Sequence, residues 1–283
     1  MADGEQHGKL ADADGEPTKC HVEGNPAQCS SRLVYSTDDK GKEILVLDTA
    51  NGSMPYMGSN TVVMMEWEKE YMQALVQALR VETSSNVLEI GWGCGYSANA
   101  IQAHKPQQHV IIECSDDVLQ RAVPWAARQS GARMVQGFWQ DVLASQDKLS
   151  NVKFDRVFFD DFPLPAADGA ASSAAAAPDS ALTESTPARS RWCDFVEACL
   201  PHMAEGGIIT GYMARPVDLE VAGVDVQIST CAVHVPDNCP YFPYDQACVA
   251  LITVRPAAQV HAVARKKRKL HNLVQQSLGL LDE

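Results

Sequence analysis

The sequence has no apolar run long enough to span a bilayer and no C-x-x-C pair. A transmembrane helix needs about 20 predominantly apolar residues, and structural zinc sites typically use closely spaced cysteine pairs, so neither a membrane span nor a metal site is indicated. The chain opens on a polar, acidic stretch, which does not have the pattern of a signal peptide. We therefore expect a cytoplasmic protein whose nine cysteines are mostly buried, reduced thiols.

Positive charge is scarce. The chain has 23 Lys and Arg against 36 Asp and Glu, a net charge of −13. Such a surface repels phosphate backbones, so we expect no general nucleic-acid binding and a preference for cationic or small zwitterionic ligands. One basic run, residues 265–269, predicts a solvated helix end, with a nuclear-import signal as the alternative.

Two regions have few apolar residues. Residues 1–30 are polar and lack apolar periodicity, which predicts a disordered tail. An insertion at about 165–190 consists almost entirely of Ala, Ser, Pro, Asp and Thr, which offer little apolar surface to offset the entropy of ordering. We expect one folded domain over 31–256 that carries this insertion, followed by a basic tail or helix over 257–283.

Between the two regions, short apolar runs alternate with helical patterns. This alternation is typical of an α/β, doubly wound, mostly parallel sheet. Helices are predicted over 62–79, 97–103, 116–129 and 192–202. Strands are predicted over 86–90, 109–113, 133–136, 154–160 and 208–212, and a Gly206-Gly207 turn precedes the last of them. The runs 224–233 and 246–254 predict a closing hairpin. Two short strands are predicted over 33–35 and 44–47, and we expect them to fold over the domain.

The strongest motif is the glycine turn in Val87–Ser97, V-L-E-I-G-W-G-C-G-Y-S. Glycines allow the backbone to turn sharply and to approach a ligand closely. A dinucleotide-binding turn needs G-x-G-x-x-G, whereas here the third glycine comes one residue early and bulky Tyr96 takes its place. The pattern E-x-G-x-G-x-G is typical of methyltransferases and predicts S-adenosylmethionine as the cofactor; a dehydrogenase or a purely structural turn are the weaker alternatives. The predicted contacts are Glu89, Gly91, Gly93 and Gly95.

Acidic residues follow three of the predicted strands. Glu113 ends the strand after the glycine turn, where a carboxylate can accept hydrogen bonds from the ribose hydroxyls. Asp141 is placed to meet the adenine amino group with Phe138 or Trp139 against the ring, although a helix N-cap explains this aspartate equally well.

Asp160 and Asp161 end the strand that lies beside the expected position of the reactive methyl group. A carboxylate there can orient an amine or a guanidine and take its proton. We expect this role for Asp160, and for Asp161 a role and a plain loop acid are equally good explanations.

Several motifs together resemble the guanidinoacetate N-methyltransferases and the related fungal arginine N-methyltransferases. The W-E-x-x-Y-M segment at Trp67–Met72 is distinctive of that group, as are Ile111–Cys114, Gly137–Asp141 and the F-D-x-[FY]-P-L pattern at Phe159–Leu164. The resemblance spans about 62–256 apart from the insertion, and Val235–Tyr244 is similar to the family's C-terminal segment. It implies a Rossmann-like class I methyltransferase with a seven-stranded, mostly parallel sheet and helices on both faces.

The resemblance also implies residue roles. Glu68 and Asp160 would grip the substrate guanidinium as the catalytic acids, with Trp67 beside them. Met64, Glu113 and Cys114 would line the cofactor site. The chain departs from the guanidinoacetate enzymes after Gly207, where G-Y-M-A-R-P replaces a polar stretch, and we expect Arg215 to clamp a substrate carboxylate.

The function expected from the sequence is S-adenosylmethionine-dependent N-methylation of a guanidino or amino group on a guanidinoacetate-like small molecule. Two alternatives remain. One is a protein arginine methyltransferase, which uses the same chemistry in a more open groove. The other is a non-catalytic binding protein that keeps the methyltransferase fold, and the acids at positions 68, 113 and 160 argue against it.

Overall fold

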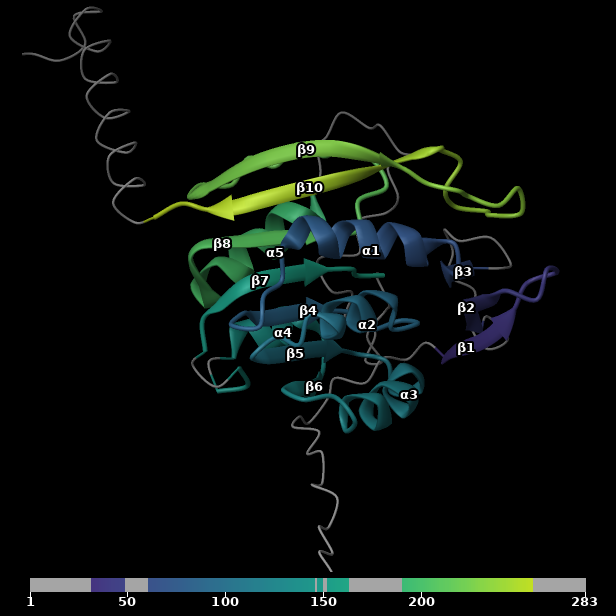
Figure 1. Cartoon of the computed structure of the whole chain (residues 1–283), viewed down its shortest axis with the longest axis horizontal. Coiled ribbons are helices and arrows are strands. Elements are labelled where there is room, and N and C mark those ends of the chain that lie inside the picture. Colours follow the sequence, from purple (N-terminus) through teal and green to yellow (C-terminus); the bar gives the residue numbers. More distant parts are fainter. Residues whose placement is uncertain (1–31, 49–60, 146, 150–151, 163–189, 257–283) are drawn as a thin grey trace, which may run out of the picture.

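A computed structural model describes residues 32–48, 61–145, 147–149, 152–162 and 190–256 (Figure 1). The predicted N-terminal tail (1–30), the basic tail (257–283) and all but Ser190 of the predicted insertion lie outside the described residues.

The domain is built on a seven-stranded sheet with the order β6-β5-β4-β7-β8-β10-β9. Strands β6, β5, β4, β7 and β8 run parallel, whereas β10 is antiparallel to both β8 and β9. The predicted Rossmann-like fold and closing hairpin are therefore confirmed. The strands are β4 (Asn86–Ile90), β5 (Gln108–Glu113), β6 (Ala132–Gln136), β7 (Phe154–Phe159), β8 (Met203–Gly211), β9 (Val224–Ala232) and β10 (Gln246–Val254).

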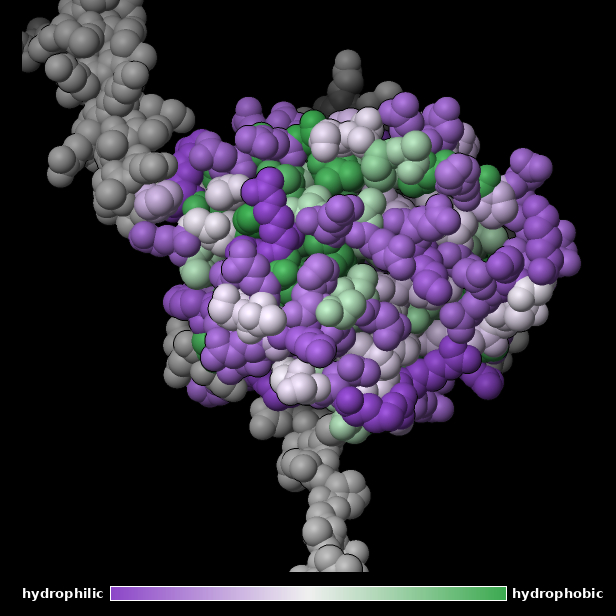
Figure 2. Space-filling model, viewed as in Figure 1, coloured by the Kyte–Doolittle hydropathy of each residue, from purple (hydrophilic) through white to green (hydrophobic). Residues whose placement is uncertain are grey.

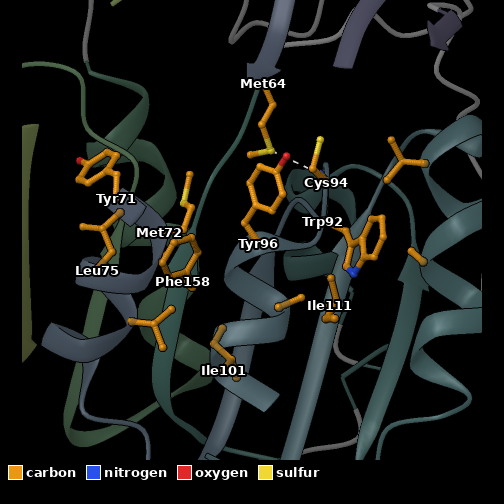
Figure 3. Packing of buried hydrophobic residues seen from close by; sticks show 14 of the residues in the cluster. Met64, Tyr71, Met72, Leu75, Trp92, Cys94, Tyr96, Ile101, Ile111 and Phe158 are labelled. Carbon is orange, nitrogen blue, oxygen red and sulfur yellow. Dashed lines mark hydrogen bonds between the residues drawn. The ribbon is translucent and has the colours of Figure 1, made fainter. Parts of the chain in front are cut away.

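Helices cover both faces of this sheet. Helices α1 (Glu68–Leu79), α2 (Tyr96–Ala103) and α3 (Asp116–Ala126) pack their apolar sides against one face, in a core that includes Met72, Ile101 and Ile111 (Figure 3). Helices α4 (Trp139–Ala144) and α5 (Arg191–Cys199), followed by a 3-10 turn at Leu200–His202, pack against the other face around Phe159 and Phe195. Because both faces are covered, the central strands are mostly apolar, and the buried Glu89 and His109 within them bind each other.

A second, three-stranded antiparallel sheet lies beyond the carboxyl ends of β4 and β5 (Figure 1). It consists of β1 (Arg32–Thr37), β2 (Glu43–Asp48) and β3 (Thr61–Met65). We refer to β1–β3 as the cover sheet, because Leu33, Leu45 and Val63 lie over the ends of the central strands.

The cover sheet corrects one prediction. The helix expected from Val62 begins only at Glu68, because Met64 and Met65 pair with Leu45 and Ile44 of β2. The apolar residues before Glu68 happen to continue the i, i+3, i+4 spacing of α1. Their conformation is nevertheless that of a strand, because they pair with β2.

Smaller differences concern the ends of elements. The Gly206-Gly207 turn expected before β8 lies within that strand, where the pairing register with β7 shifts between Phe154 and Arg156. The short helix α4 was not predicted, and none of the helices in the described ranges is long and apolar enough to cross a membrane. Of the seven cysteines described, four are buried and all are free thiols.

The outer surface is mostly hydrophilic on the face shown in Figure 2, and its hydrophobic patches gather in the upper part, where the β9–β10 hairpin lies. The large apolar side chains exposed among the described residues are Ile228 and Tyr244.

Candidate active site

The glycine turn lies between β4 and α2 and is pressed against the end of β7. Gly91 has a φ of +81°, and a Cβ at this position would lie 2.1 Å from the backbone oxygen of Asp160. The Asp160 N–H in turn donates to the Ile90 oxygen at 3.0 Å. Only glycine permits this approach, which brings the backbone of Asp160 against the predicted cofactor turn.

Met64 of β3 crosses the same turn from above. Its Sδ accepts a hydrogen bond from the Cys94 N–H at 3.3 Å, and it would lie 3.1 Å from a Cβ at Gly93. Figure 3 shows Met64 reaching down to Tyr96 and Cys94. The cover sheet therefore contacts the glycine turn directly.

A cavity of about 70 Å³ lies between the glycine turn, the ends of the central strands and the cover sheet. Many of the residues predicted to bind the cofactor or the acceptor line it: Met64, Gly91, Gly93, Glu113, Cys114, Phe138, Trp139 and Asp160. Leu33, Leu45 and Val63 supply an apolar roof.

Glu113 is buried at the end of β5 and ties it to the glycine turn. Its two carboxylate oxygens accept from the N–H groups of Trp92 at 2.9 Å and Ser115 at 2.8 Å. Burial raises the pKa of Glu113, while these backbone donors oppose the shift. The backbone N–H groups of Cys114 and Gly93 lower the pKa of Glu113 as well, so backbone donors surround the carboxylate where it borders the cavity.

Three predicted cofactor residues do not reach the cavity. Glu89 is fully buried, and its oxygens bind Ser97 Oγ at 2.5 Å and His109 Nε2 at 2.8 Å. Gly95 packs under the Trp92 ring, and Asp141 is an exposed residue in the first turn of α4, whose N-cap is Phe138. The structure therefore gives Glu89 internal partners and supports neither explanation of Asp141.

Trp139 lines the cavity only in part. Its ring packs edge-on against Phe159 and Phe195 in the core, and its Nε1 donates to Asp161 Oδ2 at 2.8 Å. Arg191 of α5 binds the same oxygen. Asp161 thus holds α4 and α5 together, which favours a structural role for the second of the two strand-end acids.

The two acids predicted to hold the acceptor, Glu68 and Asp160, interact electrostatically with each other. Glu68, at the start of α1, is only 2% exposed. Its Oε1 accepts from the Met65 N–H at 3.0 Å and from the Tyr241 hydroxyl at 2.5 Å. Burial raises the pKa of Glu68 to about 7, against the effect of both donors.

Asp160 lies across this site at the end of β7. Burial and then the Glu68 carboxylate hold the pKa of Asp160 well above its ordinary value. Burial raises the pKa of Tyr212, which follows β8, and the carboxylates of Glu68 and then Asp160 raise it further. The site therefore concentrates negative charge in a largely dehydrated setting, an arrangement that a bound cation would stabilise.

A second, larger cavity of about 930 Å³ lies beside the start of α1, where it is lined by Trp67 and Lys69, the neighbours of Glu68, whereas Glu68 itself lines neither cavity. We call it the outer groove. It lies between the β1–β2 turn, the start of α1 and the β9–β10 loop, with an aromatic wall of Trp67, Phe242 and Tyr244. The Trp67 Nε1 is buried and has no hydrogen-bond partner among the described residues. Arg215, the predicted carboxylate clamp, is exposed and lines neither cavity.

Three residues of this region were not singled out by the motifs: Tyr212, Tyr241 and Arg191. The similarity of Val235–Tyr244 to the family's C-terminal segment marked the loop that carries Tyr241, but not its contact with Glu68 across 173 positions of the chain. No local pattern marked Arg191.

Comparison with known proteins agrees with the motifs. Residues 44–173 match the family model of guanidinoacetate N-methyltransferase. The chain is 33% identical over 106 residues to protein arginine N-methyltransferase 2 of Saccharomyces cerevisiae, covering 35% of this chain and 26% of the relative. It is 31% identical over 138 residues to the protein of the same name from Yarrowia lipolytica, covering 46% and 26%.

The chain thus spans about a quarter of the length of these curated relatives. Among solved structures, it is similar to the N-methyltransferase NodS of Bradyrhizobium japonicum, with a TM-score of 0.45, 14% identity, and coverage of 67% of this chain and 97% of the other. The resemblance predicted from the motifs is confirmed over the matched residues: residues 44–173 are similar to the guanidinoacetate N-methyltransferases, and the chain has the mostly parallel, Rossmann-like sheet expected of that resemblance.

Proposed function

We propose that this protein is an S-adenosylmethionine-dependent N-methyltransferase that acts on a guanidino or amino group of a guanidinoacetate-like small molecule. The observation that carries the proposal is the pair of acids, Glu68 and Asp160, beside the glycine turn. Guanidinium is planar and cationic over the whole physiological pH range, so it matches two buried carboxylates in both charge and hydrogen-bonding geometry.

The residues around the small cavity fit the donor chemically. The backbone at Gly91 and Gly93 leaves room for the methionine part, Glu113 is placed for the ribose, and Met64, Cys114 and Phe138 border the rest. A volume of about 70 Å³ is well below the ~300 Å³ or more of typical ligand pockets, so binding requires the cover sheet to shift.

When bound, the donor supplies a methyl group that passes from its sulfonium sulfur to the acceptor nitrogen, which loses one proton. The ionised forms of Glu68 and Asp160 hold the guanidinium and aim one nitrogen at the glycine turn. Their raised pKa values make either carboxylate a competent proton acceptor near neutral pH.

The test is methyl transfer from labelled donor to guanidinoacetate, arginine, glycine and arginine-bearing peptides, with the purified full chain. Transfer to guanidinoacetate or another small guanidino acid is the expected result. Donor binding without transfer to any acceptor would refute the acceptor assignment and favour a non-catalytic binding protein.

A second candidate function is methylation of arginine residues in proteins. The outer groove favours it, because a peptide needs an open channel and this groove begins at Trp67, next to Glu68. Arg215, the predicted clamp for the carboxylate of a small acid, is exposed and lines neither cavity. Transfer to arginine-bearing peptides but not to free guanidino acids would select this candidate.

A further inference from the structure

Tyr241 reaches Glu68 from the far end of the chain. It lies in the loop between β9 and β10, and its hydroxyl donates to Glu68 Oε1 at 2.5 Å. The loop is held in place by Trp67, whose ring lies 6.3 Å from that of Tyr241 and 5.2 Å from that of Phe242. Trp67, which directly precedes Glu68, therefore packs against the β9–β10 loop, and this loop carries Tyr241, the hydrogen-bond partner of Glu68.

The hydrogen bonds of Glu68 are unequally distributed. Oε1 accepts from both Tyr241 and the Met65 N–H, at 2.5 and 3.0 Å. Two donors on one oxygen fix the plane of the carboxylate and leave Oε2 as the oxygen available to a guanidinium. We propose that Tyr241 is a positioning residue, whose hydroxyl holds Glu68 in the orientation that presents Oε2 to the acceptor. The inference rests on the proposed function.

The charged and titratable groups around Glu68 make this donor important. Asp160 at the end of β7, Tyr212 after β8 and Cys94 in the glycine turn all interact electrostatically with Glu68. None of these three supplies positive charge. In this setting the Tyr241 hydroxyl and the Met65 N–H are the groups that lower the pKa of Glu68, against the effect of burial.

Tyr241 itself stays a donor. Burial and the neighbouring Glu68 carboxylate raise the pKa of its phenol, so the hydroxyl keeps its proton at any pH at which the protein is assayed. A phenylalanine at this position keeps the ring contacts with Trp67 and removes only the hydrogen bond.

The first test needs no activity. In protein labelled with ¹³C-glutamate, the Glu68 carboxyl signal is assigned by its loss in E68Q and titrated in the wild type, Y241F and Y244F. Tyr244 is the matched control, because it is 52% exposed in the same loop and contacts Phe242. The expected result is a pKa of Glu68 higher by about one unit in Y241F and unchanged in Y244F, as the loss of a hydrogen bond to a charged group implies.

The second test separates positioning from a structural role. In Y241F, the fall of kcat/KM at low pH should begin at a higher pH than in the wild type. Relative to the wild type, kcat/KM should be about tenfold lower at pH 6 and little changed at pH 9. Donor affinity and the circular dichroism spectrum should match those of the wild type.

Each outcome has a distinct meaning. An unchanged Glu68 pKa, or an equal loss of kcat/KM at every pH, in a folded Y241F protein overturns the role of Tyr241 and leaves the proposed function intact. Failure of the wild type to methylate any acceptor instead overturns the proposed function, and it is seen before any variant is made.

Discussion

At the scale of single residues, the partners of each buried acid decide whether it is free to do chemistry. Asp160 and Asp161 are neighbours in the chain, yet Asp161 is bound by Arg191 and Trp139, whereas Asp160 faces a second carboxylate. An acid whose charge is already compensated gains little from a cationic substrate. An acid raised in pKa by burial and by a like charge gains much more.

Replacing Asp160 by asparagine should abolish most turnover. The D160N amide keeps the size of the side chain but can neither carry the charge that holds a guanidinium nor take its proton, so we expect kcat to fall by about 100-fold or more. The donor dissociation constant, measured by calorimetry, should stay within a few-fold of the wild type.

The matched control for D160N is D141N. Asp141 is exposed and lies outside the cavity, so this change should alter neither kcat nor donor affinity. Loss of donor affinity in D141N would instead support the predicted contact with adenine.

Replacing Glu68 by glutamine should stabilise the fold at high pH while reducing activity. The pKa of Glu68 is raised from about 4.5 in the unfolded chain to about 7 in the folded one, so the folded state keeps a proton that the unfolded state loses. The free energy of unfolding therefore falls as pH rises from about 4.5 to 7 and then levels off, at a cost of roughly 3 kcal/mol.

The glutamine side chain avoids this cost, and its Oε1 can still accept from Tyr241 and Met65. Urea unfolding should show E68Q more stable than the wild type at pH 8 and equal to it at pH 4. Equal stability at both pH values would contradict the raised pKa.

At the scale of elements, the cover sheet forms one wall of the small cavity. It is fastened to the domain by Glu43, which binds Arg121 at 2.8 Å and the Tyr96 hydroxyl at 3.1 Å, and by the Tyr35 hydroxyl, which donates to the Gly93 oxygen at 2.6 Å. The Arg121 guanidinium also lies 3.5 Å from the centre of the Tyr35 ring. The Leu33 N–H also donates to Asp117 Oδ2 at 2.9 Å, and Leu33 and Leu45 are buried in the core, so apolar packing and polar contacts together attach the sheet to the domain.

Loosening this attachment should speed donor binding. The R121Q substitution removes the ion pair with Glu43 and the cation–π contact with Tyr35, together worth about 1–2 kcal/mol. The association rate of the donor, followed by stopped-flow tryptophan fluorescence, should rise several-fold.

The control for R121Q is R128Q, which removes an exposed arginine just beyond the end of α3. It should leave the association rate unchanged. An unchanged rate in R121Q as well would mean that the cover sheet does not limit entry of the donor.

At the scale of the whole molecule, the net charge of −13 and the acidic acceptor site both favour the binding of a positively charged group. A negative surface attracts a cationic acceptor over distances comparable to the Debye length, which is about 10 Å at 0.1 M salt. Uncompensated acids at the site then select the cation over neutral competitors.

Added salt should therefore lower kcat/KM, which includes binding of the acceptor, more than kcat, which describes the bound acceptor. Between about 0.02 and 0.2 M salt we expect kcat/KM for an acceptor of net positive charge, such as arginine or an arginine-bearing peptide, to fall several-fold, with kcat nearly constant at saturation, whereas kcat/KM for guanidinoacetate, whose net charge is zero, should change much less. Initial rates over a salt series measure both quantities. A kcat/KM that does not depend on salt would contradict electrostatic attraction as a contribution to specificity.

The sequence by itself determined the fold class and the place of the site. Glycine spacing and strand-end acids are local patterns, and the carboxyl ends of parallel strands meet at one edge of a sheet. For this reason the sequence alone predicts that Gly91, Glu113 and Asp160 lie at the same edge of the sheet, and the structure places all three at one cavity.

Only the tertiary structure decided how each acid is used. Glu89 is bound inside the sheet by His109, Asp161 is paired with Arg191, and Glu68 is held by Tyr241. The strand conformation of Val62–Met65 likewise depends on its pairing with β2. These partners lie 16 to 173 positions away in the chain, and no local periodicity encodes a contact that forms only when distant segments pack.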